Sequence, residues 1–170
     1  WAFRSGFNVK DFTEQINDLN DIFRAKTNTP LNLYRMTSST EFTPSGAEVA
    51  LGIPFRYPAF LSTTRNPNVL RGFIPPTGIP TILKIKCPIG TAMALMEANN
   101  SLPNEEEILL QSHTQYKITN ANIISTPSAI AQHLGNYQAS KHSSIYEIEM
   151  DITANSFHLN NVSLNNFYLF

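Results

Sequence analysis

The distribution of proline is the feature that most limits what this chain can fold into. Six of its 11 prolines fall after Ile53 and before Pro88, namely Pro54, Pro58, Pro67, Pro75, Pro76 and Pro80. Proline lacks the backbone donor that a helix interior needs, and its ring clashes with the preceding turn. Long helices are therefore excluded from this stretch, and short strands joined by loops are expected there.

Two kinds of periodicity flank the proline-rich stretch. From Val9 to about Lys26, apolar residues recur at helical spacing, which predicts one amphipathic helix. Alternation from Leu31 to Met36 predicts a half-buried strand, and further strands are expected at residues 59–63, 81–87, 91–95, 107–110, 115–118, 122–125 and 144–152. Residues 127–142 are expected to form a mobile loop. A helix first and many short strands later, without regular alternation of the two, indicate an α+β domain.

Length and composition fit one domain. The 170 residues are 42% hydrophobic and 15% charged, which is enough apolar material for a single core. The formal net charge of -1 gives no general attraction for phosphate backbones, so a nucleic-acid partner is not expected. No stretch approaches about 18 consecutive apolar residues, so no membrane span is expected. Because the sequence opens at Trp1 rather than Met, we expect residues 1–170 to be one domain cut from a longer chain.

Common motifs of nucleotide, metal and redox chemistry are missing. The sequence has no GxGxxG, P-loop, HExxH or GxSxG pattern, so the corresponding enzyme classes have no local support. Its one cysteine, Cys87, cannot form an internal disulfide. The four histidines lack metal-ligand spacing, and no metal is expected.

Two polar segments stand out at the ends of predicted strands. Arg35 follows Tyr34 at the end of an apolar strand, where its guanidinium must reach solvent or meet an anion, because burial without a partner is costly. Taken alone, Arg35 is best explained by a structural salt bridge. Ser62, Thr63 and Thr64 place three adjacent hydroxyls at a strand end, which by itself favours a turn or a helix cap.

A third segment is the run of carboxylates Glu105, Glu106 and Glu107, directly before the apolar residues 108–110. Such a run is usually a solvated surface. In a strand, however, Glu105 and Glu107 would point to one side and Glu106 to the other. Two carboxylates on one face repel each other, which indicates a functional use for the pair.

The order of these three segments resembles the R-S-E class of mono-ADP-ribosyltransferases, which comprises arginine-modifying bacterial toxins and effectors and the vertebrate ecto-enzymes. Five fragments carry the resemblance, at residues 33–35, 59–64, 85–90, 105–110 and 114–118. Met36 stands where glycine is common in the class, and Thr64 stands where its second serine is usual. The disulfide cysteines of the ecto-enzymes are absent, so a bacterial toxin or effector domain is the closer relative.

The resemblance implies a fold and a co-substrate. The fold would have an N-terminal helix or helices, then two packed, mainly antiparallel sheets with an NAD cleft between them and no metal. Glu107 would face the oxocarbenium-like transition state of nicotinamide release, and Ser62 would orient Glu107. Arg35 would hold the NAD diphosphate as a planar fork. The other residues expected to contact NAD are Tyr34, the backbone of Met36, Thr63, Thr64, Arg71 and Phe73, the last as a stacking platform for nicotinamide.

The resemblance also implies an acceptor. Glu105 would activate it, and a glutamate rather than a glutamine there points to an arginine of a target protein, which the loop 97–104 would contact. The domain would then be a secreted or delivered bacterial effector that acts in the cytosol of a target cell. Three alternatives stay open: another acceptor such as a different side chain or a nucleic acid, NAD glycohydrolase activity, and a catalytically silent binding module.

Overall fold

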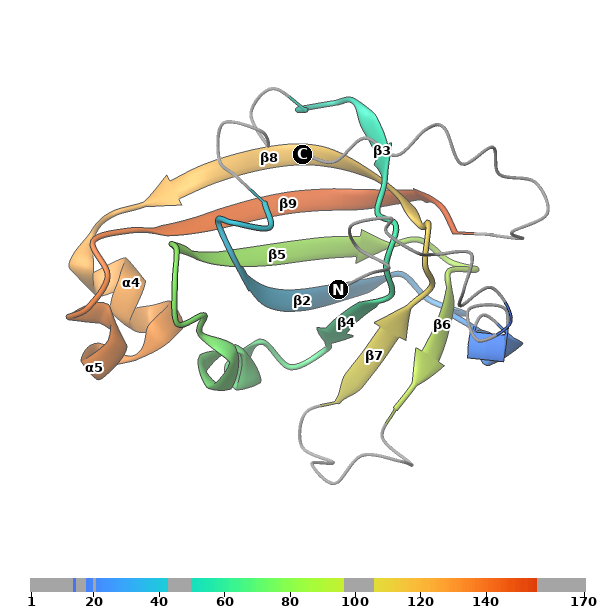
Figure 1. Ribbon diagram of the computed structural model, residues 1–170, viewed down its shortest axis with the longest axis horizontal. Helices are drawn as coiled ribbons and strands as arrows, with labels where there is room; N and C mark the ends of the chain where they lie inside the picture. The colour runs from blue at the N-terminus through green and yellow to red at the C-terminus, as the bar shows by residue number, and fades with distance from the viewer. Residues whose placement is uncertain (1–13, 15–17, 20, 43–49, 97–105, 156–170) are drawn as a thin grey trace.

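The computed structural model describes residues 14, 18–19, 21–42, 50–96 and 106–155. Strands dominate these residues, and the helices are short (Figure 1). In chain order the elements are β1 (Ala25–Lys26), β2 (Leu31–Ser38), β3 (Pro54–Arg56), β4 (Leu61–Thr64), the 3-10 helix η2 (Pro67–Phe73), β5 (Pro80–Cys87), β6 (Ala92–Leu95), β7 (Glu107–Leu110), β8 (Gln115–Ile124), α4 (Pro127–Leu134), α5 (Asn136–Ala139) and β9 (Ile145–Ala154).

All of these strands belong to one hydrogen-bonded sheet, in the order β1-β6-β7-β4-β2-β5-β9-β8-β3. Neighbours are antiparallel, except that β5 and β9 are parallel. The join between β2 and β4 is narrow, because Tyr34 and Thr64 are its single pair of register partners. The half that contains β4, β7 and β6 therefore runs at an angle to the long strands β2, β5, β9 and β8 (Figure 1).

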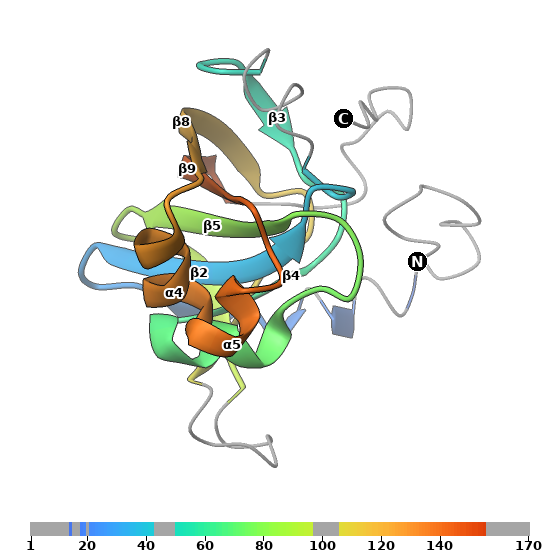
Figure 2. The ribbon, with the colours of Figure 1, turned by 90° about the vertical axis from the view of Figure 1, so that its left-hand side faces the viewer.

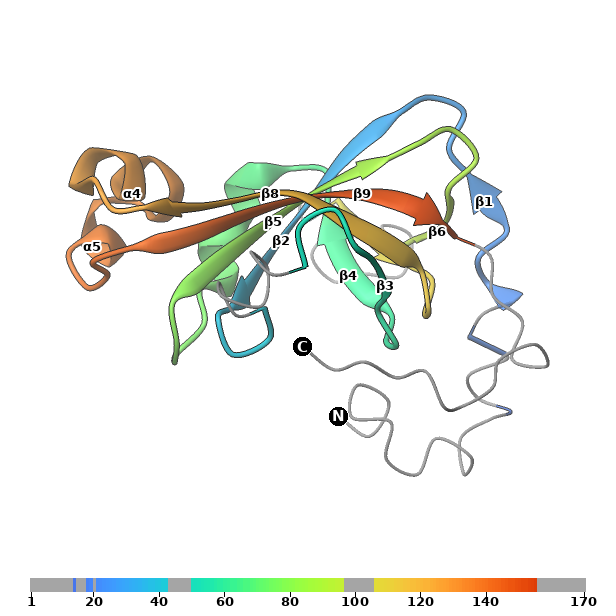
Figure 3. The same ribbon diagram turned by 90° about the horizontal axis from the view of Figure 1, so that it is seen from above.

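The main core is shared by both halves of the sheet. Leu33 on β2 and Leu83 on β5 belong to the same buried cluster as Leu61 on β4 and Ile108 on β7, and all four are at most 1% exposed. Burying each such side chain contributes roughly 1.5–3 kcal/mol of transfer free energy. The long strands twist strongly across this core, as the view from above shows (Figure 3).

A second core covers the opposite face of β2 and β5. Met36 and Ile82 pack there against Leu70 of η2 and against Ile130 and Leu134 of α4. Figure 2 shows α4, α5 and η2 gathered at one end of the long strands. None of the helices in the described residues is long and apolar enough to cross a membrane.

The sheet differs from the expected pair of separate sheets. Its two halves pack on a common core as two layers would, yet the Tyr34–Thr64 pairing joins them by hydrogen bonds. The strands expected at residues 115–118 and 122–125 are a single strand, β8, with a register shift between Ile118 and Asn120. A shift of this kind bends a strand without ending it, which a search for separate apolar runs misses.

The predicted N-terminal helix was wrong at its end. Ala25–Lys26 form β1, which pairs with Met93 and Ala92 on β6. Residues 14, 18, 19 and 21 are helical, and the other predicted helical residues before Asp21 lie outside the described residues.

The loop expected at residues 127–142 was also wrong, because these residues form α4 and α5. Pro127 stands in the first turn of α4, where its missing donor is not needed, and Gly135 ends the helix. Ile130 and Leu134, one turn apart, are both buried. Packing of this apolar stripe on the sheet stabilises a helix that is too short to persist alone.

Gly135 should be required for the junction of α4 and α5. Its φ of 81° and ψ of 157° lie in a region that is essentially restricted to glycine. Gly135→Ala should lower the free energy of unfolding by about 1–3 kcal/mol, measured by urea denaturation. Gly72→Ala is the control, because that glycine has no positive φ and no atom within 4 Å of an added Cβ. Equal stability of the two variants would contradict the prediction.

Stability should depend on the protonation of His113. Burial, assisted by the charge of Arg56, lowers the pKa of His113 from 6.5 to about 4. Between pH 6.5 and about 4, His113 is therefore protonated more in the unfolded chain than in the folded chain. The free energy of unfolding should decrease as pH falls through this range. His113→Asn should flatten this dependence, since asparagine does not titrate and tolerates the φ of 57° at this position. Parallel pH dependences of parent and variant, measured by urea denaturation, would rule out this role.

Candidate active site

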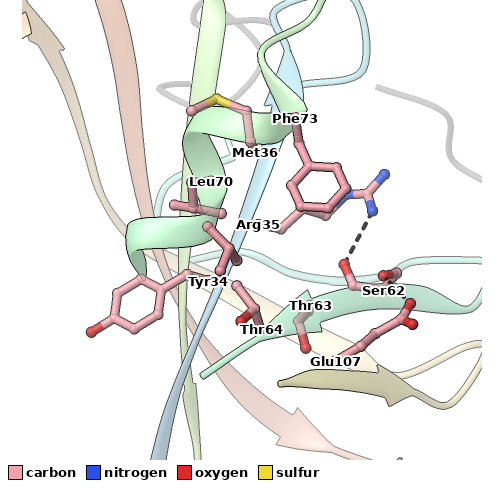
Figure 4. Close-up of a pocket in the computed structure, with 10 residues that line it drawn as sticks. Tyr34, Arg35, Met36, Ser62, Thr63, Thr64, Leu70, Phe73 and Glu107 are labelled. Atoms are coloured by element: carbon pink, nitrogen blue, oxygen red, sulfur yellow. Dashed lines mark hydrogen bonds between the residues drawn. The ribbon is translucent and has the colours of Figure 1, made fainter. Parts of the chain in front are cut away.

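A cavity of ≈ 360 Å³ lies beside the join between the two halves of the sheet. It collects residues from β2, β4, η2 and β7, which are Tyr34, Arg35, Met36, Ser62, Thr63, Thr64, Val69, Leu70, Phe73 and Glu107. Figure 4 shows Arg35 and Phe73 on one side of this space and Ser62 and Glu107 on the other. Arg35, Ser62 and Glu107, which the sequence singled out from three separate segments, therefore line one cavity.

Arg35 spans the gap between the diverging strands. Its Nη1 donates to the backbone carbonyl of Ser62 at 3.1 Å, and its Nη2 lies 3.5 Å from Oε2 of Glu41. Only 17% of the Arg35 side chain is exposed, and its buried Nε has no hydrogen-bond partner among the described residues. The cavity therefore holds a permanent positive charge in a nearly dry setting, where such a charge attracts anions strongly.

Ser62 and Glu107 form the polar wall opposite Arg35. The Ser62 hydroxyl donates to Oε1 of Glu107 at 2.6 Å, the length of a charge-assisted bond. The two side chains meet because β4 and β7 are antiparallel neighbours, with Thr64 opposite Glu107 and Ser62 opposite Leu109. The bond fixes one oxygen of the carboxylate toward β4.

The backbone before Glu107 departs from the strand geometry that the sequence suggested. β7 begins at Glu107, and Glu106 has a left-handed φ of 46°. The alternation that would place Glu105 and Glu107 on one strand face therefore does not extend through Glu106. Glu105 lies outside the described residues, and so does the loop 97–104, and the proximity of Glu105 to Glu107 remains a prediction.

The two threonines after Ser62 have structural contacts. The Thr63 hydroxyl is buried and donates to the carbonyl of Ile108 at 2.6 Å, which fastens β4 to β7. Thr64 Oγ1 accepts from the backbone of Asn66 at 2.9 Å. The side chain of Asn66 in turn accepts from the backbone of Asn68 and so caps η2. The turn predicted for these hydroxyls is therefore present at Thr64, but the predicted cap is wrong, because Asn66 and not a hydroxyl caps η2.

The remaining lining is mostly apolar. Tyr34 and Met36 flank Arg35 on β2, while Leu70 and Phe73 come from η2 (Figure 4). The Phe73 side chain is 49% exposed, and a half-exposed ring at a cavity mouth can stack on a planar ligand. The cavity thus pairs an apolar rim with a few fixed charges, which is typical of ligand sites.

Arg71 is in the neighbourhood but does not line this cavity. It belongs to an adjoining one of ≈ 470 Å³, together with Lys84 and His133. Its guanidinium donates to the carbonyls of Gln132 at 2.8 Å and His133 at 3.3 Å. In this structure Arg71 fastens η2 to the end of α4.

The residues that contact Arg35 from outside the cavity were not predicted from the sequence. Glu41 accepts hydrogen bonds from the hydroxyls of Thr37 and Tyr57 and pairs with Arg35. Thr37 lies four residues before Glu41 and Tyr57 16 residues after it, and nothing in the local pattern marks them. The apolar lining residues Val69 and Leu70 were missed for the same reason.

Cys87 is not among the described residues that line the cavity. Burial raises the pKa of the Cys87 thiol to about 12, so it stays protonated and is a poor nucleophile. In the part of the chain that the structure describes, His, Cys, Asp and Glu side chains form no group of three or more that could hold a metal ion.

Comparison with known proteins identifies the kind of fold. A family model described as ADP-ribosyltransferase exoenzyme matches residues 4–150. No curated protein matches the chain by sequence.

Solved structures share this fold at low sequence identity. Plx2a, an ADP-ribosyltransferase toxin from Paenibacillus larvae, matches with a TM-score of 0.61 and 19% identity over 85% of this chain and 72% of its own. BECa, an ADP-ribosylating toxin of C. perfringens solved with NADH, matches with a TM-score of 0.61 and 18% identity over 84% of this chain and 35% of its own. Exoenzyme S of Pseudomonas aeruginosa, solved with a 14-3-3 protein and carba-NAD, matches with a TM-score of 0.59 and 16% identity over 97% of this chain and 70% of its own. The predicted α+β fold of this type is therefore confirmed.

Proposed function

Because the chain belongs to the ADP-ribosyltransferase exoenzyme family, we propose that it transfers ADP-ribose from NAD to an arginine of a target protein. The bond between the nicotinamide nitrogen and C1' of the ribose breaks, and its electron pair leaves with nicotinamide. A guanidinium nitrogen of the acceptor arginine then bonds to C1' and loses a proton. No metal takes part in this scheme.

The observation that carries the proposal is the Ser62–Glu107 bond at 2.6 Å on the cavity wall. Nicotinamide loss develops positive charge on the ribose, and a carboxylate fixed nearby stabilises that charge without having to reorganise. Glu107 is this carboxylate and also holds the ribose 2'-hydroxyl. Ser62 orients Glu107 by donating to its Oε1.

Arg35 binds the NAD diphosphate. Its guanidinium lines the cavity with 17% of the side chain exposed, and it still has donors beyond those that contact Ser62 and Glu41. A planar fork matches two phosphate oxygens at once. The site therefore offers a cation for the diphosphate and a carboxylate for the ribose.

The nicotinamide ring fits the apolar rim. We assign stacking to the half-exposed Phe73 and pairing with the nicotinamide amide to the backbone of Met36. Tyr34, Thr63 and Thr64 complete the NAD contacts, while the Thr63 hydroxyl also holds β4 against β7 and the Thr64 hydroxyl holds the turn before η2. Arg71 contacts NAD only if its guanidinium leaves the carbonyls of α4.

The acceptor side of the site rests on Glu105. This carboxylate contacts the incoming arginine and draws a proton from it, while the loop 97–104 contacts the target protein. Residues 1–170 act as a single domain of a longer bacterial toxin or effector that is secreted or delivered into the cytosol of a target cell.

The test of the proposed function is to incubate the protein with labelled NAD and a cell lysate and to locate the modified residue by mass spectrometry. Label on another side chain or on nucleic acid would refute the arginine assignment.

Arg35→Lys should weaken NAD binding more than it affects folding. Lysine keeps the charge but cannot form a two-pronged contact, and losing one charge-assisted hydrogen bond corresponds to about tenfold in affinity or more. Calorimetric titration with NAD measures the effect. Arg24→Lys is the matched control, because Arg24 is exposed and lies outside the cavity lining. An unchanged NAD affinity in Arg35→Lys would contradict the diphosphate role.

The two carboxylates should separate by mutation. Glu107→Gln removes an interaction made mainly in the transition state, so both nicotinamide release and protein labelling should decrease by about 10²-fold or more. Glu105→Gln should abolish labelling of arginine and leave slow NAD hydrolysis largely in place, because water needs no guanidinium partner. Nicotinamide release and protein labelling are measured in parallel for both variants.

Glu106→Gln is the control for the carboxylate pair. Its ion pair with Arg65 is 41% exposed on each side, and such pairs contribute little. Both activities should stay near the parent rate in this variant. Labelling at the parent rate in Glu105→Gln would refute the division of roles, and loss of both activities there would mean that the two carboxylates act as one unit.

A further inference from the structure

The carboxylate of Glu41 contacts Arg35 from outside the cavity. Its Oε1 accepts from the hydroxyl of Tyr57, and its Oε2 accepts from the hydroxyl of Thr37 and lies 3.5 Å from Nη2 of Arg35. The Glu41 side chain is 15% exposed and does not line the cavity. Both carboxylate oxygens are thus engaged, and the charge faces Arg35 from a fixed position.

The position of Glu41 is set by the turn that follows β2. The backbones of Glu41 and Phe42 both donate to the carbonyl of Ser38, at 2.9 and 3.2 Å. Phe42 is buried and stacks on the ring of Tyr57 with centroids 6.0 Å apart. The same packing therefore places the turn that carries Glu41 and the phenol that donates to it.

This arrangement fixes Arg35 at two points on either side of its guanidinium. The carbonyl of Ser62 accepts from Nη1 and the Glu41 carboxylate faces Nη2. An arginine side chain has about 2 kcal/mol of rotamer entropy to lose on binding a ligand. If that entropy is lost during folding instead, a diphosphate meets a guanidinium that is already oriented.

We propose that Glu41 is a positioning residue for substrate binding, which acts through Arg35 with Thr37 and Tyr57 as its supports. The proposal rests on the proposed function for its substrate, NAD. Glu41 holds the guanidinium in a fixed orientation and does not itself contact NAD. Its role is therefore in the affinity for NAD, not in the bond-breaking step.

Glu41→Gln tests the proposal by steady-state nicotinamide release. The amide removes the negative charge and presents an N–H group where a carboxylate oxygen stood. The KM for NAD should rise about tenfold, with kcat within about twofold of the parent. Glu149→Gln is the matched control, a carboxylate-to-amide change on β9 outside the cavity lining, and its KM should not change. A parent-like KM in a folded Glu41→Gln variant, or a fall in kcat with constant KM, would overturn the proposal.

A double-mutant cycle with Tyr57→Phe separates positioning from general stability. Tyr57→Phe removes the hydroxyl and keeps the ring that stacks on Phe42, and its KM should rise by about threefold. Because the hydroxyl acts through Glu41, the double variant should have the same KM as Glu41→Gln alone. Additive effects on KM would show that Tyr57 acts on the site by another route, and the proposal would fail.

A measurement without NAD keeps this proposal distinct from the proposed function. In ¹⁵N-labelled parent protein, the buried Nε–H of Arg35 should give a slowly exchanging signal, assigned by its loss in Arg35→Lys. Glu41→Gln should speed its exchange with water severalfold. An unchanged exchange rate would overturn the positioning role, even if NAD is a substrate. Accelerated exchange in a protein that releases no nicotinamide would support the positioning role and refute the proposed function.

Discussion

The site depends on how little β2 and β4 are bonded to each other. Their ladder has one pair of partners, Tyr34 and Thr64, and beyond it the strands diverge. Backbone groups that leave a ladder need other partners when they are shielded from water. The carbonyl of Ser62 is satisfied by the guanidinium of Arg35 at 3.1 Å. The Arg35 side chain therefore bonds to β4 where β2 and β4 separate, and the cavity lies at this separation.

The divergence is maintained from both sides of the sheet. The cluster that includes Leu33 and Leu61 fills the space between the two halves, while Leu70 of η2 packs behind β2 with Met36 and Ile82. Neither cluster can close the gap without losing buried apolar area, at about 25 cal/mol per Å². Rigid packing on each side thus keeps Arg35 and Glu107 apart without help from a ligand.

Several parts of this structure were predictable from the chain alone, and the reasons are local. Residues 107–110 form a strand as expected. Arg35 was expected at the end of its strand but lies inside β2, and Arg35, Ser62 and Glu107 meet because β2, β4 and β7 are neighbours in the sheet. Glu41 was not predictable, since its partners Thr37, Tyr57 and Arg35 meet it only in the folded chain. α4 was missed although Pro127 and Gly135 mark its ends, because only two residues, Ile130 and Leu134, form its buried stripe. The left-handed backbone of Glu106 was not predictable, because Glu105, Glu106 and Glu107 are identical residues and nothing in the sequence distinguishes the middle one.

The parallel pairing of β5 with β9 has a consequence for how the chain acquires its shape. Thr81 is aligned with Tyr146, and β6, β7, β8, α4 and α5 lie between the two strands in sequence. Contacts of such separation are slow to form, because the chain must close a long loop before it gains any pairing. On a ribosome, β5 would keep an uncovered edge until β9 had emerged, and uncovered edges invite association with other strands. The edge of β5 is therefore covered only when β9, the last strand of the described residues, has been synthesised.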